Sequence, residues 1–262
     1  MNMNLGAMHN TPGDVGSYGL LYQWGRKDPF PAAPTLTGTT ATVGAPIYDG
    51  DNNEIKITNS SQSSTADNNL AFAIANPTVC LSNYAQFNTS RDWLQADMSN
   101  DALWGNPKGA ERNETNDFLN KGAKSFYDPC PVGWRVPPAD VFRNFTASGG
   151  YAWVIDDFDI ADISGDGAKS LADYDYGWTF NLSDSASSYF PAAARFDGSY
   201  AMLMGSMSGL WGSYWGNAPY PGDMFQGGAY SVLSFQIKDT AGNEMITTSP
   251  AGGGARADAY SV

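Results

Sequence analysis

A chain of 262 residues is long enough to bury a substantial core, in one large domain or two small ones. Aromatic residues make up 13% of it and charged residues only 16%, so solubility depends on Asn, Ser, Thr and Gly as well as on acids. The formal net charge of −13 argues against nucleic acid or an anionic membrane surface as a partner. No apolar run is long enough to insert into a bilayer as a spanning helix. An acidic surface rich in aromatic and amide groups suits carbohydrate or protein ligands better.

The histidine and cysteine content disfavours several kinds of site. His9 is the only histidine, and hydrolase triads and most zinc sites depend on histidine. Cys80 and Cys130 allow one disulfide but cannot form a zinc cluster alone. Paired acids such as Asp156 and Asp157 arise by chance among 27 acidic residues, so we expect no enzymatic activity.

The first ten residues lack the basic start and the hydrophobic core of a signal peptide. Two explanations are open: the protein is cytosolic, or the sequence is a domain of a longer exported chain. We favour the exported chain.

The first half of the chain predicts few regular elements. Residues 18–24 (YGLLYQW) form an apolar run bounded by glycines, which predicts a buried strand. Residues 34–64 are rich in Thr, Ser, Asn and Gly and are typical of a long surface segment, with a small hairpin near its IKI sequence. An acid three residues after a hydroxyl at Ser64–Asp67 indicates a helix start and predicts a helix over 66–75.

Residues 127–138 (YDPCPVGWRVPP) contain four prolines, which exclude a helix interior or a central strand. We expect a stiff, extended corner with Trp134 and Val136 buried, followed by a short helix that begins at Pro138. The alternative is that Arg135 contacts a ligand.

The second half predicts strands separated by turns. Tyr189–Ala194 and Ala201–Met204 read as strands joined by the turn RFDGSY. Residues 229–237 alternate apolar and polar side chains and give the clearest strand, with 244–247 pairing back on it. A glycine loop then leads to a final strand that ends at Val262. With few helical segments, the predicted class is α+β with short helices, small antiparallel sheets and long ordered loops.

Residues 205–228 form a glycine-rich, aromatic segment that we predict to be a loop and the main ligand surface. Aromatic faces stack on sugars, and Tyr and Trp offer rigid amphipathic contacts to proteins. The candidate binding residues, with their neighbours, are Tyr200, Met202, Trp211, Tyr214, Trp215, Asn217, Tyr220 and Phe225. The alternative is that half of the aromatic residues fill the core.

The segment Asp162–Asp173 (DISGDGAKSLAD) resembles a calcium-binding loop. Oxygen-bearing side chains occupy ligand positions, and Gly167 falls where such a loop turns sharply. The candidate metal ligands are Asp162, Ser164, Asp166 and Asp173. Calcium is therefore the one candidate cofactor, and we expect that the protein requires no cofactor. Against it, Lys169 replaces the usual apolar residue, and an acidic, solvated insertion is the alternative.

Several separated motifs together resemble the Fibrobacter succinogenes major paralogous domain, which occurs in surface and fimbrillin-type proteins of Bacteroidetes. The motifs are NLGA at 4–7, YGLLYQWGRKDPFP at 18–31, DPCPVGWRVP at 128–137, YGWTFNL at 176–182, YFPAAARFDG at 189–198 and the ending RADAYSV. The resemblance implies a single C-type-lectin-like domain over 1–262, close in fold to formylglycine-generating enzymes, with insertions near 35–65 and 150–175. It also implies display outside the cell or on the outer membrane.

The chain departs from the family pattern at its cysteines. The family typically ends SVRCV, with a cysteine that could bridge the one in DPCP, whereas this sequence stops at Val262. Cys130 therefore lacks that partner, and pairing with Cys80 is possible but not implied. The reactive cysteine pair of the enzyme relatives is not reproduced.

The expected function is a non-enzymatic, adhesin-like domain of a bacterial cell-surface or fimbria-associated protein. Its partner would be a host or bacterial surface glycan or protein, not nucleic acid. Two alternatives remain open. One is a variable protein of a diversity-generating retroelement, with diversified residues over 200–225. The other is a structural pilus subunit.

Overall fold

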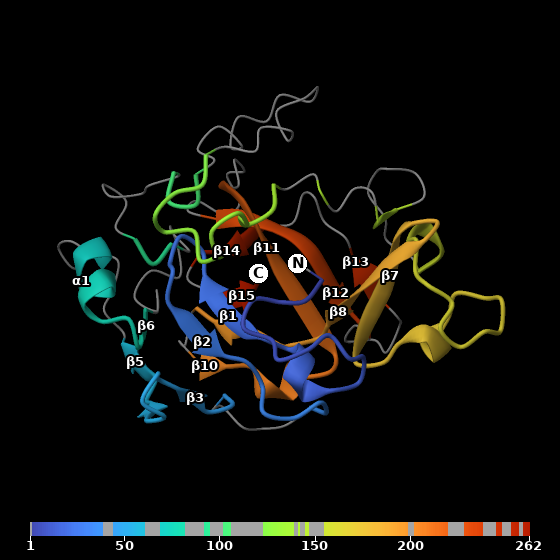
Figure 1. The fold of residues 1–262 in the computed structure, drawn as a ribbon, viewed down its shortest axis with the longest axis horizontal. Helices are drawn as coiled ribbons and strands as arrows, with labels where there is room; N and C mark the ends of the chain where they lie inside the picture. Colours follow the sequence, from blue (N-terminus) through green and yellow to red (C-terminus); the bar gives the residue numbers. More distant parts are fainter. Residues whose placement is uncertain are drawn as a thin grey trace.

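A curled, mostly antiparallel sheet forms the centre of the fold (Figure 1). The computed structural model describes residues 2–38, 44–60, 69–81, 92–94, 102–105, 123–138, 141, 145–146, 155–198, 202–219, 228–237, 245–247, 253–256 and 259–262. Most of the regular structure in these residues is strand, and little of it is helix. This agrees with the coarse form of the predicted class.

Within the described residues, nine strands belong to the central sheet. They are β1 Leu20–Gln23, β2 Pro29–Pro31, β9 Phe196–Asp197, β10 Met202–Leu203, β11 Trp211–Pro219, β12 Gly228–Gln236, β13 Met245–Thr247, β14 Gly253–Ala255 and β15 Ala259–Ser261. Three strand pairs accompany it: β3 Ile47–Tyr48 with β4 Glu54–Ile55, β5 Thr58–Ser60 with β6 Val79–Leu81, and β7 Gly177–Ser183 with β8 Ala186–Pro191. The described helices are α1 Asn69–Ala75 and the 3-10 helices η1 Val15–Ser17, η7 Ile155–Asp157, η8 Leu171–Asp173 and η9 Gly205–Met207.

Strand β15, near the C-terminus, lies inside the sheet rather than at its edge. The main strand order is β10-β9-β15-β11-β12-β13, and β1 also pairs with β15 and with β2. The amide of Leu5 donates to the carbonyl of Val262 at 2.8 Å, so the two ends of the chain lie close together (Figure 1). The strands predicted over 18–24 and at the C-terminus are confirmed, and they pair with each other.

The strands predicted in the second half are found near their expected positions. Strand β12 matches the prediction, and β13 pairs back on it. The strand expected at Tyr189–Ala194 is β8, which pairs with β7, and the one expected at Ala201–Met204 is β10, which pairs with β9. The segment RFDGSY between them is more than a turn, because it contains β9. Pro191 ends β8, since proline has no donor for a strand ladder, and Ala194 has a φ of 63°, which turns the chain before β9 begins.

Two smaller predictions are confirmed in part. The pair β3–β4 is the hairpin expected within the 34–64 segment. Helix α1 covers residues 69–75 of the predicted helix, and its first residues, 66–68, lie outside the described chain. The helix predicted after Pro138 also falls largely outside it. No helix among the described residues is both long and apolar enough to cross a bilayer.

Aromatic side chains fill much of the buried core. One cluster contains Trp24, Trp93, Trp104 and Trp215, and a second is built on phenylalanines from β7 and the segment before it. The indole N–H groups find backbone acceptors: Trp24 Nε1 donates to the carbonyl of Gly216 at 3.0 Å, and Trp93 Nε1 donates to that of Trp24 at 2.8 Å. These two buried tryptophans thus join separate segments with their polar atoms satisfied.

Cys80 and Cys130 are reduced thiols, and both are buried. They belong to different apolar clusters, so the disulfide between them that the sequence left open is not formed. Burial, followed by the negative charge of Asp128, raises the pKa of the Cys130 thiol to about 12. Because the thiolate is the reactive form, this thiol is protected in the folded protein.

We predict that neither cysteine of the native protein reacts with Ellman's reagent at pH 8 on the time scale of a free thiol. In about 6 M guanidinium chloride, which unfolds most domains, both cysteines should react at once. The absorbance of the released thiolate measures this. A non-reducing sample that releases no thiol after unfolding would contradict the structure.

Candidate functional site

Most of the predicted aromatic contacts lie on β11, which is a strand and not the predicted loop. Tyr214, Trp215 and Asn217 are at most 2% exposed, so the prediction that they face a ligand is wrong. Met202 and Trp211 are half-buried. Tyr200, Tyr220 and Phe225 lie outside the described residues.

The buried members of this set tie β11 to its neighbours. Tyr214 donates its hydroxyl to the carbonyl of Pro191 at 2.7 Å, and burial raises the pKa of Tyr214 well above its ordinary value. Trp215 Nε1 donates to the carbonyl of Tyr22 at 2.7 Å, and its ring stacks on Tyr260 with centroids 4.1 Å apart. These residues hold β11 against the segments around it, which is the core alternative that the sequence had left open.

Trp211 marks the more accessible end of β11. The guanidinium of Arg195 lies 4.6 Å from its ring centroid, and its Nε1 donates to Ser234 Oγ at 3.1 Å. Trp211 is therefore partly exposed, yet its indole N–H is already hydrogen-bonded within the sheet.

The predicted calcium loop is held by its own carboxylates. Asp162 accepts from the amides of Gly165 at 2.6 Å and Gly167 at 2.9 Å, and the buried Asp173 accepts from the amides of Ser164 at 3.0 Å and Ser170 at 3.1 Å. Among the described residues, no group of three or more His, Cys, Asp or Glu side chains is placed to hold a metal ion.

In this structure, these side chains form hydrogen bonds within the loop, chiefly with backbone amides, and do not form an open set of metal ligands. They belong to Asp162, Ser164, Asp166 and Asp173. Asp166 itself accepts from the amide of Ala168 at 2.8 Å. Calcium binding here stays a prediction of the sequence, which a calcium titration followed by the melting temperature tests.

Asp173 also closes the start of η8. Its carboxylate and the Ser170 side chain form a reciprocal capping box. Burial raises the pKa of Asp173, but the hydrogen bonds from Ser164 and Ser170 together lower it by more. The pKa of Asp173 therefore lies below its ordinary value. A depressed pKa contributes stability above the unfolded-state pKa, and this contribution is lost as the pH falls through the folded-state pKa.

A small cavity of about 130 Å³ lies beside the turn between β1 and β2. Its lining comes from this turn, from α1 and from two further segments. The lining residues are Gly25, Arg26, Lys27, Asp28, Leu70, Ala73, Ile74, Trp93, Phe126 and Tyr127. We call it the Arg26 pocket.

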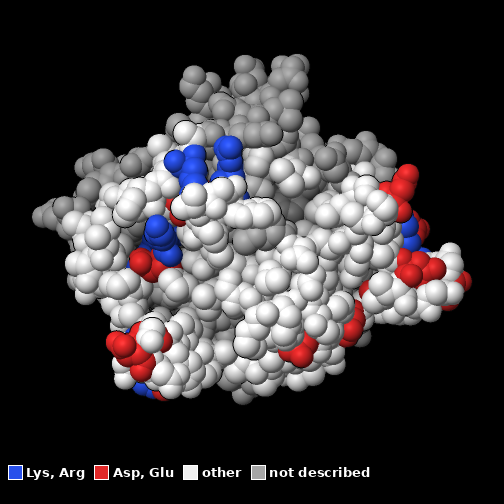
Figure 2. All heavy atoms as spheres, viewed as in Figure 1, with Lys and Arg blue, Asp and Glu red and all other residues white. Residues whose placement is uncertain are grey.

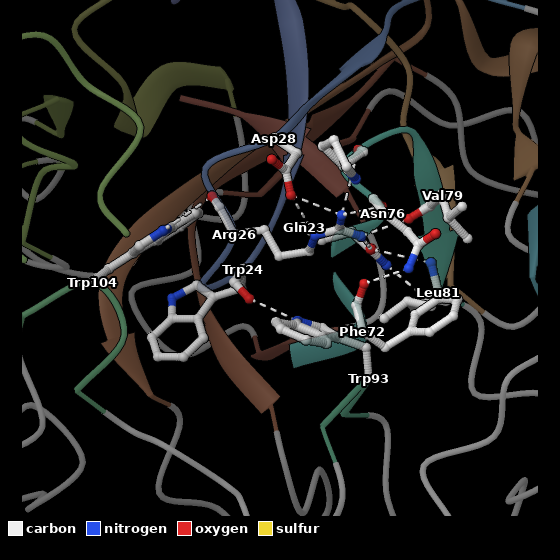
Figure 3. A network of polar contacts seen from close by, with 11 residues as sticks. Gln23, Trp24, Arg26, Asp28, Phe72, Asn76, Val79, Leu81, Trp93 and Trp104 are labelled. Atoms are coloured by element: carbon white, nitrogen blue, oxygen red, sulfur yellow. Dashed lines mark hydrogen bonds and ion pairs between the residues drawn. The ribbon is translucent and has the colours of Figure 1, made fainter. Parts of the chain in front are cut away.

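Arg26 forms part of the wall of this pocket, and its donors are used inside the protein (Figure 3). It is 2% exposed. Nη2 and Nε donate to Asp28 Oδ2 at 2.8 and 3.2 Å, and Nη1 donates to Gln23 Oε1 at 3.0 Å and to the carbonyl of Val79 at 2.7 Å. The guanidinium also lies 5.8 Å from the ring centroid of Trp93. Arg26 therefore has a structural role and makes its part of the pocket wall rigid.

Large apolar side chains stand exposed around the pocket. Phe126 is 82% exposed and Ile74, from α1, is 58% exposed. The ammonium group of Lys27 lies 5.0 Å from the ring centroid of Phe126. The floor beneath them is buried and apolar, with Trp93 and Ala73 at 1% and 2% exposure.

Asp128 holds the segment that carries Phe126. Its buried carboxylate accepts from the amides of Cys130 at 2.9 Å and Val136 at 3.0 Å, and from Lys124 Nζ at 2.8 Å. A single carboxylate thus fixes both ends of the predicted stiff corner. The absence of regular structure over 131–138 agrees with the proline argument.

The corner differs from its prediction at Trp134. Val136 is fully buried as predicted, but Trp134 is 50% exposed and Val132 is 97% exposed, so the prediction of a buried Trp134 is wrong. The reason is a tight turn: the amide of Trp134 donates to the carbonyl of Pro131 at 3.0 Å, and Gly133 has a φ of 85°. This turn directs residues 132–135 toward solvent, and Arg135 is exposed with them.

Positive charge gathers on the same face. Figure 2 shows Lys and Arg side chains over the segment 123–138 and the turn between β1 and β2, whereas most Asp and Glu side chains of this view lie toward its lower and right edges. Lys27 and Arg135 are exposed, and Lys124 is paired with Asp128.

Sequence reasoning placed the functional surface elsewhere and missed Phe126, Ile74 and Lys27. The pocket is assembled from four separate segments between Gly25 and Tyr127, and periodicity within a segment cannot reveal such contacts. The available signal was the pair of motifs YQWGRKDPF and DPCPVGWRVP, since each contributes to the pocket or to its support.

We predict that Arg26→Lys lowers the free energy of unfolding by about 3–5 kcal/mol, because an ammonium group cannot replace the paired bonds to Asp28 and leaves buried acceptors unmatched. Urea unfolding measures the change. Lys56→Gln is the control, because the Lys56 side chain is 73% exposed in its ion pair with Glu54. It should lower the free energy of unfolding by less than about 1 kcal/mol. Equal effects of the two substitutions would contradict the structural role of Arg26.

We predict that Asp173→Asn lowers the free energy of unfolding by about 1 kcal/mol at pH 7, because the capping box is lost. The difference from the unchanged protein should shrink as the pH falls below about 4. Urea unfolding at pH 7 and pH 3 measures both values, with the exposed Asp184→Asn as the control. A difference that does not depend on pH would exclude ionised Asp173 as its source.

Comparisons of the chain with protein-family models, with curated proteins and with solved structures gave no match. The likeness of its motifs to the Fibrobacter succinogenes major paralogous domain therefore stays a resemblance.

Proposed function

We propose that this chain is a non-enzymatic ligand-binding domain of a bacterial surface or fimbria-associated protein, with a lectin-like fold. It binds a protein or glycan outside the cell through the Arg26 pocket and the exposed residues of 123–138. The observation that carries the proposal is Phe126, a phenylalanine 82% exposed at the rim of a pocket.

The exposed residues belong to a segment that the fold holds rigidly. Asp128 joins Lys124, Cys130 and Val136 through hydrogen bonds, while Phe126, Val132 and Trp134 remain in solvent. Exposed apolar groups that are already ordered lose little entropy when a partner covers them. Clusters of such side chains mark interaction surfaces in soluble proteins.

Binding fits the chemistry of the pocket better than catalysis does. Asp28 is the carboxylate among the lining residues, and its Oδ2 is held by Arg26 at 2.8 Å. The acceptors of Arg26 are likewise groups of the protein itself. These bonds keep the pocket wall in place, so the charged groups here serve the fold.

The predicted variable face over 200–225 is a weaker candidate surface. Replacing a fully buried aromatic such as Trp215 leaves a cavity that costs about 3–5 kcal/mol. Tyr214 and Trp215 are therefore poor positions for frequent replacement, in contrast to Phe126 and Trp134, which no core contact restricts to the same degree.

We predict that Phe126→Ala and Trp134→Ala each weaken capture of the ligand about tenfold, as removal of a central aromatic contact does. Biosensor chips coated with outer-membrane fragments or host-cell membranes measure capture. The melting temperature should stay nearly constant, because both side chains are exposed. Leu182→Ala, at a 51% exposed leucine of β7, is the matched control. Capture that both variants retain in full would refute the proposed surface.

A further inference from the structure

We infer that the Arg26 pocket accepts one apolar side chain of an acidic segment of a partner protein. The inference rests on the proposed function and specifies its partner class. It follows from the size of the pocket, the chemistry of its floor and the charge of its rim.

The size of the pocket excludes large ligands. Its volume is about 130 Å³, whereas pockets that enclose small-molecule ligands or cofactors hold about 300–1,000 Å³. A pocket of this size suits a single buried anchor, which is how one aliphatic or aromatic residue at the centre of a protein interface is held.

The floor favours an apolar anchor. Trp93 and Ala73 close the pocket from below, and Leu70 lines its side on α1. The donors of Arg26 are directed to Asp28, Gln23 and Val79 rather than into the cavity. A sugar hydroxyl entering here would therefore find few partners, and an unpaired buried hydroxyl is unfavourable.

The rim defines what flanks the anchor. Ile74 and Phe126 frame the pocket as exposed apolar walls, and covering them removes apolar surface from water. Lys27 is exposed and stands beside Phe126. A carboxylate next to the anchor would meet this cation, so the favoured segment is an apolar residue with an Asp or Glu neighbour.

A second copy of this chain is a less suitable occupant. Two copies each carry a net charge of −13, and their long-range repulsion opposes association. A short acidic segment carries far less charge, so its repulsion from the chain is weaker.

The test uses a phage library of random heptapeptides panned against the immobilised full chain, with the Phe126→Ala variant as counter-selection. We expect the enriched peptides to share one Leu, Ile, Met, Phe or Trp flanked by Asp or Glu. Fluorescence anisotropy of a synthetic copy of the most enriched peptide then gives its Kd.

Matched variants assign the contacts. Ile74→Ala should weaken this peptide about tenfold and Leu182→Ala should leave it unchanged, since the two residues are similarly exposed but lie on different elements. Lys27→Gln should weaken binding of the peptide about threefold at low salt. The effect should be smaller at about 0.5 M salt, because salt screens the attraction between Lys27 and the acids of the peptide. Lys56→Gln should have no effect.

Three results would overturn the inference. The first is enrichment of no peptide that depends on Phe126, or of peptides without acids. The second is capture by a glycan array that Phe126→Ala abolishes, which keeps the proposed function but changes the partner class. The third is self-association in analytical ultracentrifugation that Ile74→Ala abolishes, which makes a second copy the occupant. Loss of the proposed function itself is recognised separately, by membrane capture that Phe126→Ala and Trp134→Ala leave intact.

Discussion

The fold depends on the hydrogen bonds that converge on the end of β1, from Gln23 to Arg26. Gln23 bonds both the carbonyl and the amide of Leu81, and Arg26 reaches Val79. The indoles of Trp93 and Trp104 donate to the carbonyls of Trp24 and Arg26. Segments that carry little regular structure of their own are thus attached to one strand of the central sheet.

Two buried arginines show how these attachments tolerate charge in the core. Arg26 pairs with Asp28, and Arg256 pairs with Asp92 at 3.0 Å while lying 4.3 Å from the ring centroid of Trp24. Taking a guanidinium out of water is costly, and full pairing plus an aromatic face offsets that cost. Both arginines belong to motifs that carry the family resemblance, which explains the motifs as structural requirements of this core.

The same supports hold the surface for which we propose a binding function. The turn that ends β1 supplies Lys27 and Asp28, α1 supplies Ile74, and Asp128 fixes the segment that carries Phe126. Rigid elements therefore surround a small apolar pocket, with the exposed cation Lys27 at its rim. The buried hydrogen bonds that hold the fold and the exposed apolar side chains belong to different residues. The exposed side chains can therefore be replaced without disrupting the core.

The sequence by itself determined the strands whose patterns are local. The apolar run at 18–24, the alternation over 229–237 and the prolines of 127–138 each limit the backbone through neighbouring residues alone. Tertiary structure decided which aromatic residues are buried. Trp215 and Trp134 both lie among glycines or prolines in the sequence, yet one is inside β11 and the other is half exposed. The difference arises because burial depends on contacts with distant segments, such as the carbonyl of Tyr22 for Trp215, and no local pattern encodes them.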